Sequence, residues 1–357
     1  MRALTVIPGQ ANSARLDNMP EPSPGDGSVV VRTLAIGICG TDREIVAGKY
    51  GWAPPGESRL VIGHESLGKV ESAPIDSGFK PGDLVAGIVR RPDPVPCPAC
   101  AVGEWDMCRN GLYTERGIKE RHGFGSDFFR IEPKFLVKVD SALGAAGVLL
   151  EPTSVVAKAW DHIERIGART ASWKARRVLV TGAGPVGLLA AMIGAERGLD
   201  LHVLDRAQSG DKPNLVRALG GTYHSDVSEL KSIEPDIVLE CTGASQVVLD
   251  AVACVAPGGI VCLAGVSSGG RKIEIDVGLL NREMVLENNV VFGSVNANRA
   301  HYEAAAEALS RASKPWLNHL ITRRVAPEDW QSALKRRDDD IKVVIDFTLG
   351  RTDGQSH

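Results

Sequence analysis

The sequence predicts an α/β protein with two domains, one rich in β-structure and one built on a doubly wound parallel sheet. The chain has 357 residues, and about 150 residues make an average domain, so two domains are expected. Up to about residue 155 the chain is rich in Gly, Pro and short β-branched runs. Beyond that point short apolar strands alternate with helices, which is typical of a parallel sheet.

The first part is expected to form a compact β-rich domain with long loops. Strands are predicted at 28–35 and 84–89, where β-branched and other apolar residues dominate. A turn is predicted at 80–83 (KPGD), because Pro presets one backbone angle and Gly adopts a conformation that other residues avoid. The segment 90–110 is crowded with Pro and Cys, and we expect it to be a functional loop.

The second part alternates helices and strands. It opens with a helix at 152–169, where apolar residues recur at helical spacing. The strands expected after it are 177–181, 201–204, 236–241, 259–264 and 289–294, with helices at 186–195 and 214–219. The tail, from about residue 313, adds a helix near 328–335 and a last strand at 342–347.

Composition excludes several classes of protein. Lys and Arg number 41 and Asp and Glu number 44, a net charge of −3, so the basic excess of a nucleic-acid-binding protein is absent. No apolar run approaches the ~18 residues that a membrane helix needs, and the N-terminus has no signal-peptide pattern. The seven cysteines, an odd number in a long chain, fit a reducing compartment, so a cytoplasmic protein is expected.

A glycine fingerprint predicts a dinucleotide site. The run G-A-G-P-V-G follows a predicted strand and opens a predicted helix, the context in which a pyrophosphate binds at a helix N-terminus. Its candidate cofactor-binding residues are Gly182, Gly184, Pro185, Val186 and Gly187.

An acidic residue at the end of the second strand of that domain bears on the choice of nucleotide. Asp205 stands there and would accept hydrogen bonds from the adenosine ribose, which favours NAD, since it would repel a 2′-phosphate. Arg206 is adjacent and would bind that phosphate if Asp205 turned away. NAD is therefore the preferred cofactor and NADP the other candidate.

Three residues in the first part suit a catalytic metal. Cys39, His64 and Glu151 offer a thiolate, an imidazole and a carboxylate, a set that suits Zn²⁺. Three protein ligands and an open position are the arrangement of a catalytic zinc site. Spacing along the chain does not show whether these residues meet in space.

These motifs together resemble the medium-chain, zinc-dependent dehydrogenases. The G-H-E-x-x-G motif at 63–68, the C-G-T-D loop at 39–42, the 80–83 turn and the glycine fingerprint occur in that family's order along essentially the whole chain. Within the family the chain is most similar to the archaeal-type glucose (aldose) dehydrogenases. The segments that carry this likeness are CGTDREIV at 39–46, DMCRNGLYTER at 106–116, PKFLVKV at 133–139, REMVL at 282–286 and GSVN at 293–296.

The resemblance implies a domain organisation and a set of site residues. A GroES-like catalytic domain would comprise 1–155 and 314–357, and a Rossmann nucleotide-binding domain would comprise 156–313. Cys39, His64 and Glu151 would bind the zinc, with Glu65 behind them or as an exchanging ligand, and Thr41 would relay a proton. Residues that line the sugar and nicotinamide pocket in that subgroup correspond to Glu115, Asn296 and His301, and the cofactor set adds Thr242 and Asn296.

A second metal cluster is suggested by three cysteines. The family often carries a structural zinc on four cysteines, and Cys97, Cys100 and Cys108 fit the last three positions. Pro94 occupies the first position and cannot bind a metal, but the neighbouring Asp93 can supply a carboxylate. The alternative is a lobe that folds without metal and keeps free thiols.

The resemblance therefore predicts an enzyme that oxidises the C1 hydroxyl of an aldose, D-glucose above all, to the lactone, with hydride transfer to NAD(P). A polyol or secondary-alcohol dehydrogenase of the sorbitol dehydrogenase type is the alternative, since it shares the Cys/His/Glu ligands. A non-catalytic relative on the same fold is a third reading, against which the retained ligands argue. A small-molecule sugar is the expected partner, in a homo-oligomer (dimer or tetramer) that binds neither nucleic acid nor membrane.

Overall fold

The computed structural model describes residues 1–267 and 272–349, and the chain divides into two compact units. Unit 1 is Met1–Ser154 with Asn296–His357, and unit 2 is Val155–Val295. The predicted nucleotide domain ran to residue 313, whereas 296–313 cluster with unit 1, since helix α8 (Arg299–Arg311) packs against strand β11 (Leu136–Lys138). Residues 350–357 of the predicted C-terminal segment lie outside the described residues.

Unit 1 is built on a seven-stranded sheet, to which the C-terminal tail contributes two strands. Its order is β11, β6 (Leu84–Gly87), β5 (Glu65–Ser72), β3 (Val29–Ile38), β19 (Lys342–Asp346) and β18 (Ile321–Val325), with β10 (Phe128–Ile131) also paired to β3. Strand β19 pairs antiparallel with the end of β3, Val343 opposite Ile38. The last strand of the chain therefore lies beside the residue that precedes Cys39.

Smaller elements complete unit 1. Two three-stranded sheets have the orders β2 (Arg15–Asn18), β1 (Arg2–Val6), β4 (Leu60–Val61) and β7 (Arg90–Arg91), β8 (Thr114–Arg116), β9 (Glu120–Arg121). The other α-helices of this unit are α1 (Gly40–Val46), α2 (Pro98–Ala101), α9 (Lys314–Leu320) and α10 (Trp330–Leu334). The segment 90–110, expected to be a loop, thus holds strand β7 and helix α2.

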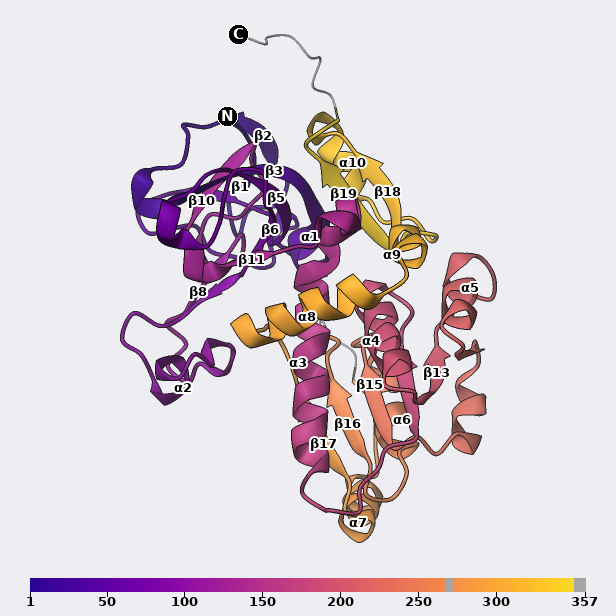
Figure 1. Cartoon of the computed structure of the whole chain (residues 1–357). Coiled ribbons are helices and arrows are strands. Elements are labelled where there is room, and N and C mark those ends of the chain that lie inside the picture. Colours follow the sequence, from indigo (N-terminus) through magenta and orange to yellow (C-terminus); the bar gives the residue numbers. More distant parts are fainter. Residues whose placement is uncertain (268–271, 350–357) are drawn as a thin grey trace. The chain divides into compact units, whose positions relative to one another are not determined.

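Unit 2 is a six-stranded parallel sheet with helices, as Figure 1 shows. The strands have the order β14 (Thr222–His224), β13 (Asp200–Leu204), β12 (Arg177–Thr181), β15 (Ile237–Glu240), β16 (Ile260–Leu263) and β17 (Val290–Gly293). This is the doubly wound order: β12, β13 and β14 follow one another towards one edge of the sheet, and β15, β16 and β17 follow one another towards the other edge. The predicted α/β class is confirmed, while β14 was not anticipated.

Helices connect the parallel strands of unit 2, as a parallel sheet requires. The helices are α3 (Leu150–Gly167), in which the chain passes from unit 1 to unit 2 after Ser154, α4 (Pro185–Glu196), α5 (Asp211–Ala218), α6 (Ser245–Ala253) and α7 (Val277–Glu287). Helix α4 packs on β12 and β13, and α6 on β15 and β16. Because both faces are covered, the strands are continuous apolar runs; in β12, Val178, Leu179 and Val180 are fully buried.

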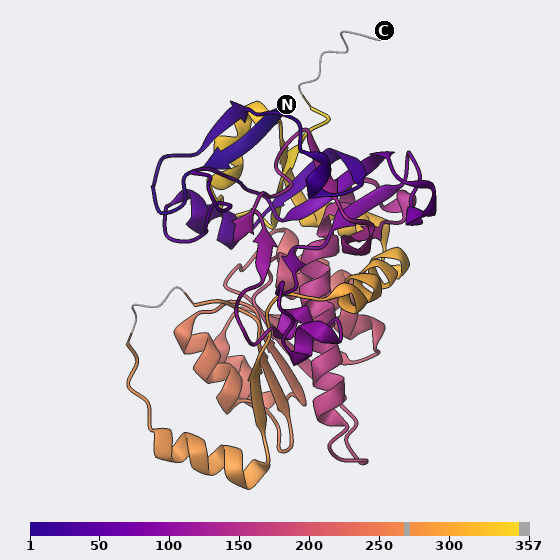
Figure 2. The same ribbon diagram turned by 90° about the vertical axis from the view of Figure 1, so that its left-hand side faces the viewer.

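Helix α7 differs from the other helices of unit 2. It has no buried residue, and Figure 2 shows it standing apart from the strands before the chain enters β17. Val277, Leu279, Val285 and Leu286 are all more than half exposed on it. Large apolar side chains gathered on an uncovered element usually mark a contact surface.

One helical segment is long and apolar enough to be tested as a membrane span. Ser141–Gly167 qualifies by length and mean hydropathy, although the sequence showed no apolar run of that length. Of its most apolar window, 72% is buried inside the molecule. The segment is therefore a core helix by its packing.

Candidate active site

Three metal-binding side chains meet at the start of strand β5 in unit 1. Ligand atoms of Cys39, His64 and Glu65 all lie within 4.8 Å of one another, and we call this group the mixed cluster. Cys39 precedes helix α1, and its Sγ accepts the N–H of Thr41 at 3.2 Å. The Sγ of Cys39 is 3.1 Å from Nε2 of His64. The structure thus brings together two of the three predicted ligands, with Glu65 beside them.

A buried carboxylate orients the imidazole of His64. Oδ1 of Asp42, a fully buried residue, lies 3.3 Å from Nδ1 of His64, and Oδ2 accepts the N–H of Cys39 at 2.9 Å. Burial lowers the pKa of His64, but the charges of Cys39 and Asp42 raise it well above its ordinary value. The surroundings of His64 therefore attract a cation, and a carboxylate behind a ligating histidine is a common support of metal sites.

Glu65 is held by a lysine from the far end of the chain. Nζ of Lys342, in strand β19, lies 2.7 and 2.6 Å from the two carboxylate oxygens of Glu65, and both side chains are buried. A Cβ at position 37 would lie 2.0 Å from Oε2 of Glu65, so Gly37 makes room for this carboxylate. Lys342 was not predicted, although a lysine in the otherwise apolar run KVVI is a signal that could have found it.

Glu151 lies in the first turn of α3, outside the group within 4.8 Å. The pKa of Glu151 is raised to about 7, by burial first and also by the charges of Glu65 and Asp42, while the charge of His64 acts to lower it. Its carboxylate is thus close enough to the mixed cluster to be affected by its charges. A bound cation would favour the ionised form of Glu151 in place of this crowding of carboxylates.

The donor set of the mixed cluster fits a divalent zinc ion. It comprises a thiol, an imidazole with its second nitrogen supported by Asp42, and the carboxylate of Glu65, and Glu151 adds a second carboxylate nearby. Oδ1 of Asp42 and Nδ1 of His64 form no well-aligned hydrogen bond in the structure. These buried polar atoms and the mixture of sulfur, nitrogen and oxygen donors are what a catalytic zinc site uses.

A network of hydrogen-bonded polar side chains is centred on Glu115, also in unit 1. Oε1 of Glu115 accepts from Nε and Nη2 of Arg90, at 3.1 and 3.0 Å, and from Nδ2 of Asn296 at 2.6 Å. Asn296 has a left-handed backbone (φ 63°), a conformation that non-glycine residues adopt at a cost and often at functional sites. The predicted substrate residues Glu115 and Asn296 are therefore in direct contact.

His301 is a buried residue in the first turn of α8. Its Nδ1 accepts the N–H of Asn298 at 3.3 Å and lies 4.0 Å from Oδ2 of Asp106. Nδ2 of Asn298 donates to Oδ1 of Asp106 at 2.9 Å. His301 is thus not a surface residue, and Asn298 and Asp106 are partners that sequence reasoning missed.

In unit 2 the glycine fingerprint forms the turn between β12 and α4. A Cβ at Gly187 would lie 1.7 Å from the carbonyl oxygen of Gly182, so this position admits only glycine. A Cβ at Gly184 would meet nothing, and no side chain caps α4, which begins at Pro185 and Val186. Open space and uncapped N–H groups at this helix start fit a pyrophosphate.

The carboxyl ends of the neighbouring strands carry Asp205 and Thr242. Oδ2 of Asp205 accepts the N–H of Ala183 at 2.7 Å, and Nζ of Lys212 lies 3.2 and 3.3 Å from its two oxygens. Burial raises the pKa of Asp205, but the N–H of Ala207 and the charge of Lys212 lower it below its ordinary value. Thr242 donates its N–H and hydroxyl to the buried Glu240, and the side chain of Arg206 is exposed.

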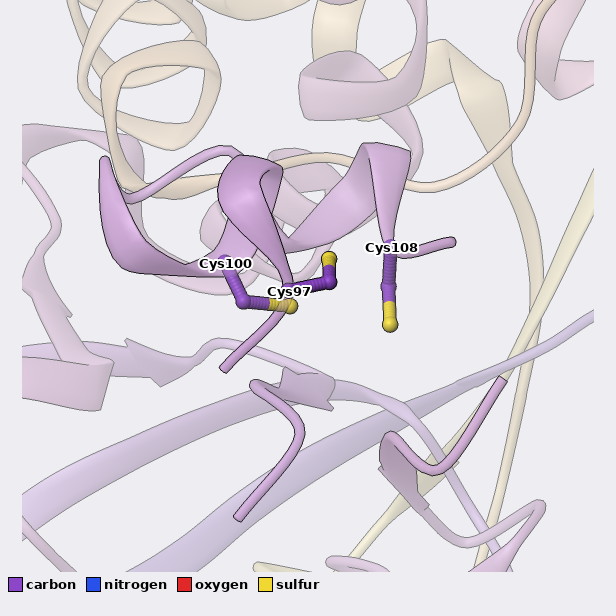
Figure 3. A group of neighbouring side chains, drawn as sticks. All are labelled: Cys97, Cys100 and Cys108. Atoms are coloured by element: carbon purple, nitrogen blue, oxygen red, sulfur yellow. The ribbon is translucent and has the colours of Figure 1, made fainter. Parts of the chain in front are cut away.

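A second cluster in unit 1 consists of thiols. Ligand atoms of Cys97, Cys100 and Cys108 lie within 4.8 Å of one another, and Figure 3 shows the three side chains gathered around helix α2; we call them the thiol cluster. Oδ1 of Asp93 accepts the N–H of Val95, whereas its buried Oδ2 has no hydrogen-bond partner within residues 1–267 and 272–349.

The environment of this cluster fits a metal held by three sulfurs and one oxygen. Backbone N–H donors, that of Arg109 first, lower the pKa of Cys97 to about 6, while burial raises that of Cys100. The backbone of Asp93 also donates a hydrogen bond to Cys100, which places this residue beside the thiols. A metal would supply the partner that Oδ2 of Asp93 lacks.

Comparison with known proteins gives a consistent result. Residues 25–141 match the alcohol dehydrogenase GroES-like domain, and residues 144–347 match the glucose dehydrogenase C-terminus. The chain is 37% identical to glucose 1-dehydrogenase of Methanocella arvoryzae and 40% identical to glucose 1-dehydrogenase 2 of Vulcanisaeta moutnovskia. Each alignment covers 97% of this chain and 99% of the relative.

A solved structure is similar over the same length. The glucose dehydrogenase of Haloferax mediterranei, in complex with NADP, Zn and gluconolactone, has a TM-score of 0.88 and 33% sequence identity to this chain. The alignment covers 97% of this chain and 99% of that one.

Proposed function

The chain belongs to the glucose dehydrogenase family of zinc-dependent medium-chain dehydrogenases, and from this premise we propose that it oxidises D-glucose at C1 to the lactone with NAD(P) as hydride acceptor. The observation that carries the proposal is the mixed cluster, a zinc-type donor set in a chain alike over its full length to glucose 1-dehydrogenases. Gluconolactone, bound in the Haloferax mediterranei enzyme, is the product of this oxidation.

Residues of the mixed cluster, together with Glu151, would hold the metal. Cys39, His64 and Glu151 would bind Zn²⁺, and Glu65, which is paired with Lys342, would be an alternative ligand. When bound, the ion acts as a Lewis acid that lowers the pKa of the sugar's C1 hydroxyl. Asp42 keeps His64 oriented with Nε2 towards Cys39.

The chain's own polar groups orient the sugar and move the proton. Glu115, Asn296 and His301 hydrogen-bond the sugar hydroxyls, and such a site rejects analogues that lack them because its buried polar groups would be left unpaired. The hydroxyl of Thr41, on the first turn of α1, relays the proton of the C1 hydroxyl: it takes up that proton as it passes its own on to water. The C1–H bond breaks, its hydride passes to C4 of the nicotinamide, and the C1–O bond becomes the lactone carbonyl.

The nucleotide is bound by unit 2. The pyrophosphate lies against Gly182, Gly184 and Gly187 at the start of α4, where the first N–H groups of the helix are uncapped. Asp205 and Arg206 face the adenosine ribose at the end of β13, and Thr242 lies at the neighbouring strand end.

The proposal is tested by the absorbance of reduced nicotinamide. The protein is mixed with D-glucose and NAD or NADP, and with sorbitol and simple alcohols in parallel, after its zinc content has been measured. We expect a rapid increase in absorbance with glucose and none with sorbitol. Turnover with sorbitol alone would assign a polyol dehydrogenase, and inactivity of the zinc-loaded protein with every sugar and alcohol would overturn the proposed activity.

The thiol cluster is proposed as a structural zinc site. Cys97, Cys100 and Cys108 supply three thiolates and Asp93 the fourth ligand, which leaves no open position for a substrate. Full loading then corresponds to two zinc ions per chain.

We propose a homo-oligomer, a dimer or tetramer. The support is the exposed apolar side chains of helix α7, which directly precedes β17, the strand at the edge of the unit 2 sheet. Light scattering should give a mass of two or four chains, and Leu279→Asp with Val285→Asp should lower it. A monomeric parent protein would contradict the proposal.

The cytoplasm is the proposed location. All seven cysteines are free, and three of them gather as thiols in one cluster, which requires a reducing compartment.

A further inference from the structure

The carboxylate of Asp205 already has a full set of partners within unit 2. Its Oδ2 accepts the N–H of Ala183, and its Oδ1 accepts the N–H of Ala207 at 3.1 Å. Nζ of Lys212, in the first turn of α5, lies 3.2 Å from Oδ1 and 3.3 Å from Oδ2. Only 15% of the Asp205 side chain and 13% of the Lys212 side chain are exposed, so water competes weakly for this pair.

These contacts leave the carboxylate no vacant acceptor. An ionised carboxylate has about four lone-pair sites, and two backbone N–H groups and two contacts from Lys212 occupy them. A ribose hydroxyl can bond to Asp205 only where Lys212 withdraws. The usual discrimination against a 2′-phosphate by a bare carboxylate is therefore weakened here.

The charge balance points the same way. Lys212 neutralises Asp205, while Arg206, the next residue after Asp205, is exposed and has no hydrogen bond or ion pair within residues 1–267 and 272–349. A 2′-phosphate on the adenosine ribose would therefore lie near Asp205, whose charge is neutralised by Lys212, and near the unpaired guanidinium of Arg206. Arginine and phosphate form strong charge-assisted hydrogen bonds.

We propose that Lys212 is a specificity-determining residue that, by covering Asp205, makes the adenosine site accept a 2′-phosphate, so that the chain uses both NADP and NAD. The inference rests on the proposed function only in that the glycine fingerprint binds a dinucleotide. It needs no sugar and no metal, so it can be tested without turnover.

The test is calorimetric titration of the whole protein with ADP and with 2′,5′-ADP, which differ in the 2′-phosphate alone. The parent protein should bind 2′,5′-ADP no more than about threefold more weakly than ADP. In Lys212→Met, which keeps most of the side chain's stem, binding of 2′,5′-ADP should weaken at least about tenfold, the value of one charge-assisted contact, while ADP binding stays within threefold. In Asp205→Asn, binding of 2′,5′-ADP should tighten relative to ADP.

A control separates this role from general charge and from folding. Lys174→Met removes an exposed lysine of the same unit and should leave the ratio of the two dissociation constants unchanged. The proposal is overturned if Lys212→Met weakens both ligands equally, since Lys212 would then only brace the turn, or if the ratio does not move. If the parent protein binds neither ligand, the inference and the nucleotide site fall together. If both bind while glucose is not oxidised, the proposed activity alone falls.

Discussion

The two clusters of unit 1 offer a metal ion different sets of ligands. The mixed cluster joins Cys39, His64 and Glu65, and two buried charged residues, Asp42 and Lys342, hold its imidazole and carboxylate in place. The thiol cluster has three sulfurs from 12 residues of chain and an unpaired oxygen of Asp93.

This difference indicates that the fold positions the mixed cluster, whereas the thiol cluster contributes to the stability of the fold. The mixed cluster draws Cys39 from the end of β3, His64 from the start of β5 and Lys342 from β19, so the sheet builds it. The thiol cluster lies on short elements around α2 that bury little apolar surface, so a metal bound there would organise the loop. Activity should follow the first cluster and stability the second.

The largest expected effect is the loss of activity when a ligand of the mixed cluster is removed. His64→Ala removes a ligand of the mixed cluster and should lower kcat/KM for glucose by about a thousandfold or more, since Lewis-acid assistance contributes several kcal/mol. Steady-state kinetics with zinc analysis measures this. His319→Ala, at an exposed histidine on α9, is the control. Parental rates in His64→Ala would exclude metal chemistry at this cluster.

The second effect is on stability. Cys108→Ser should destabilise the protein by about 3 kcal/mol, a fraction of what a structural zinc contributes, and halve the zinc content. Thermal unfolding and metal analysis detect it, while kcat should stay within about twofold. The control is Cys254→Ser, which changes a half-buried cysteine at the C-terminal end of α6. An unchanged zinc content would assign free thiols to this loop.

The third effect concerns the support of His64. Asp42→Asn keeps the shape but removes the charge, and outer partners of metal ligands typically contribute 10–100-fold in affinity or activity, about 1.4–2.8 kcal/mol. We expect kcat to fall within that range and zinc to bind more weakly. Asp76→Asn, an exposed residue, serves for comparison. A kcat equal to the parent's would leave Asp42 with a structural role alone.

The smallest effect tests the fourth ligand of the thiol cluster. Asp93→Asn retains an oxygen donor without its charge and should weaken zinc binding there about tenfold, or about 1.4 kcal/mol. Competition with a chromogenic chelator measures the zinc affinity of this site, and one ion per chain should be lost more readily than in the parent protein. Glucose turnover should not change. If the ion is retained as in the parent protein, Asp93 does not bind it.

Much of unit 2 was predictable because its signals are local. The strand, glycine turn and helix around Gly182 and Gly187 lie within twenty residues, and the alternation of apolar runs indicated the parallel sheet. Strand β14 escaped because Thr222–His224 has three residues and no apolar pattern. The partner of Asp205 also escaped, since no rule of spacing places Lys212 on a carboxylate seven residues earlier.

The candidate site was only partly predictable. Asp42 lies three residues after Cys39, where its carboxylate caps the start of α1, and this local pattern could have been recognised. Lys342 stands out in the sequence as a lysine in an apolar run, but its partner could not be predicted, because Glu65 lies 277 residues earlier and their contact depends on the pairing of β19 with β3. Long-range packing also places Asn296 and His301 in unit 1, and the composition of the local sequence could not predict this domain boundary.

The central claim is that hydride leaves C1 of glucose for the nicotinamide. The most direct measurement is mass spectrometry of the reduced nucleotide formed from D-glucose deuterated at C1, with glucose deuterated at C2 as control. The account predicts one deuterium in the reduced nucleotide from the C1-labelled sugar and none from the C2-labelled sugar. Reduced nucleotide without deuterium from the C1-labelled sugar would contradict it.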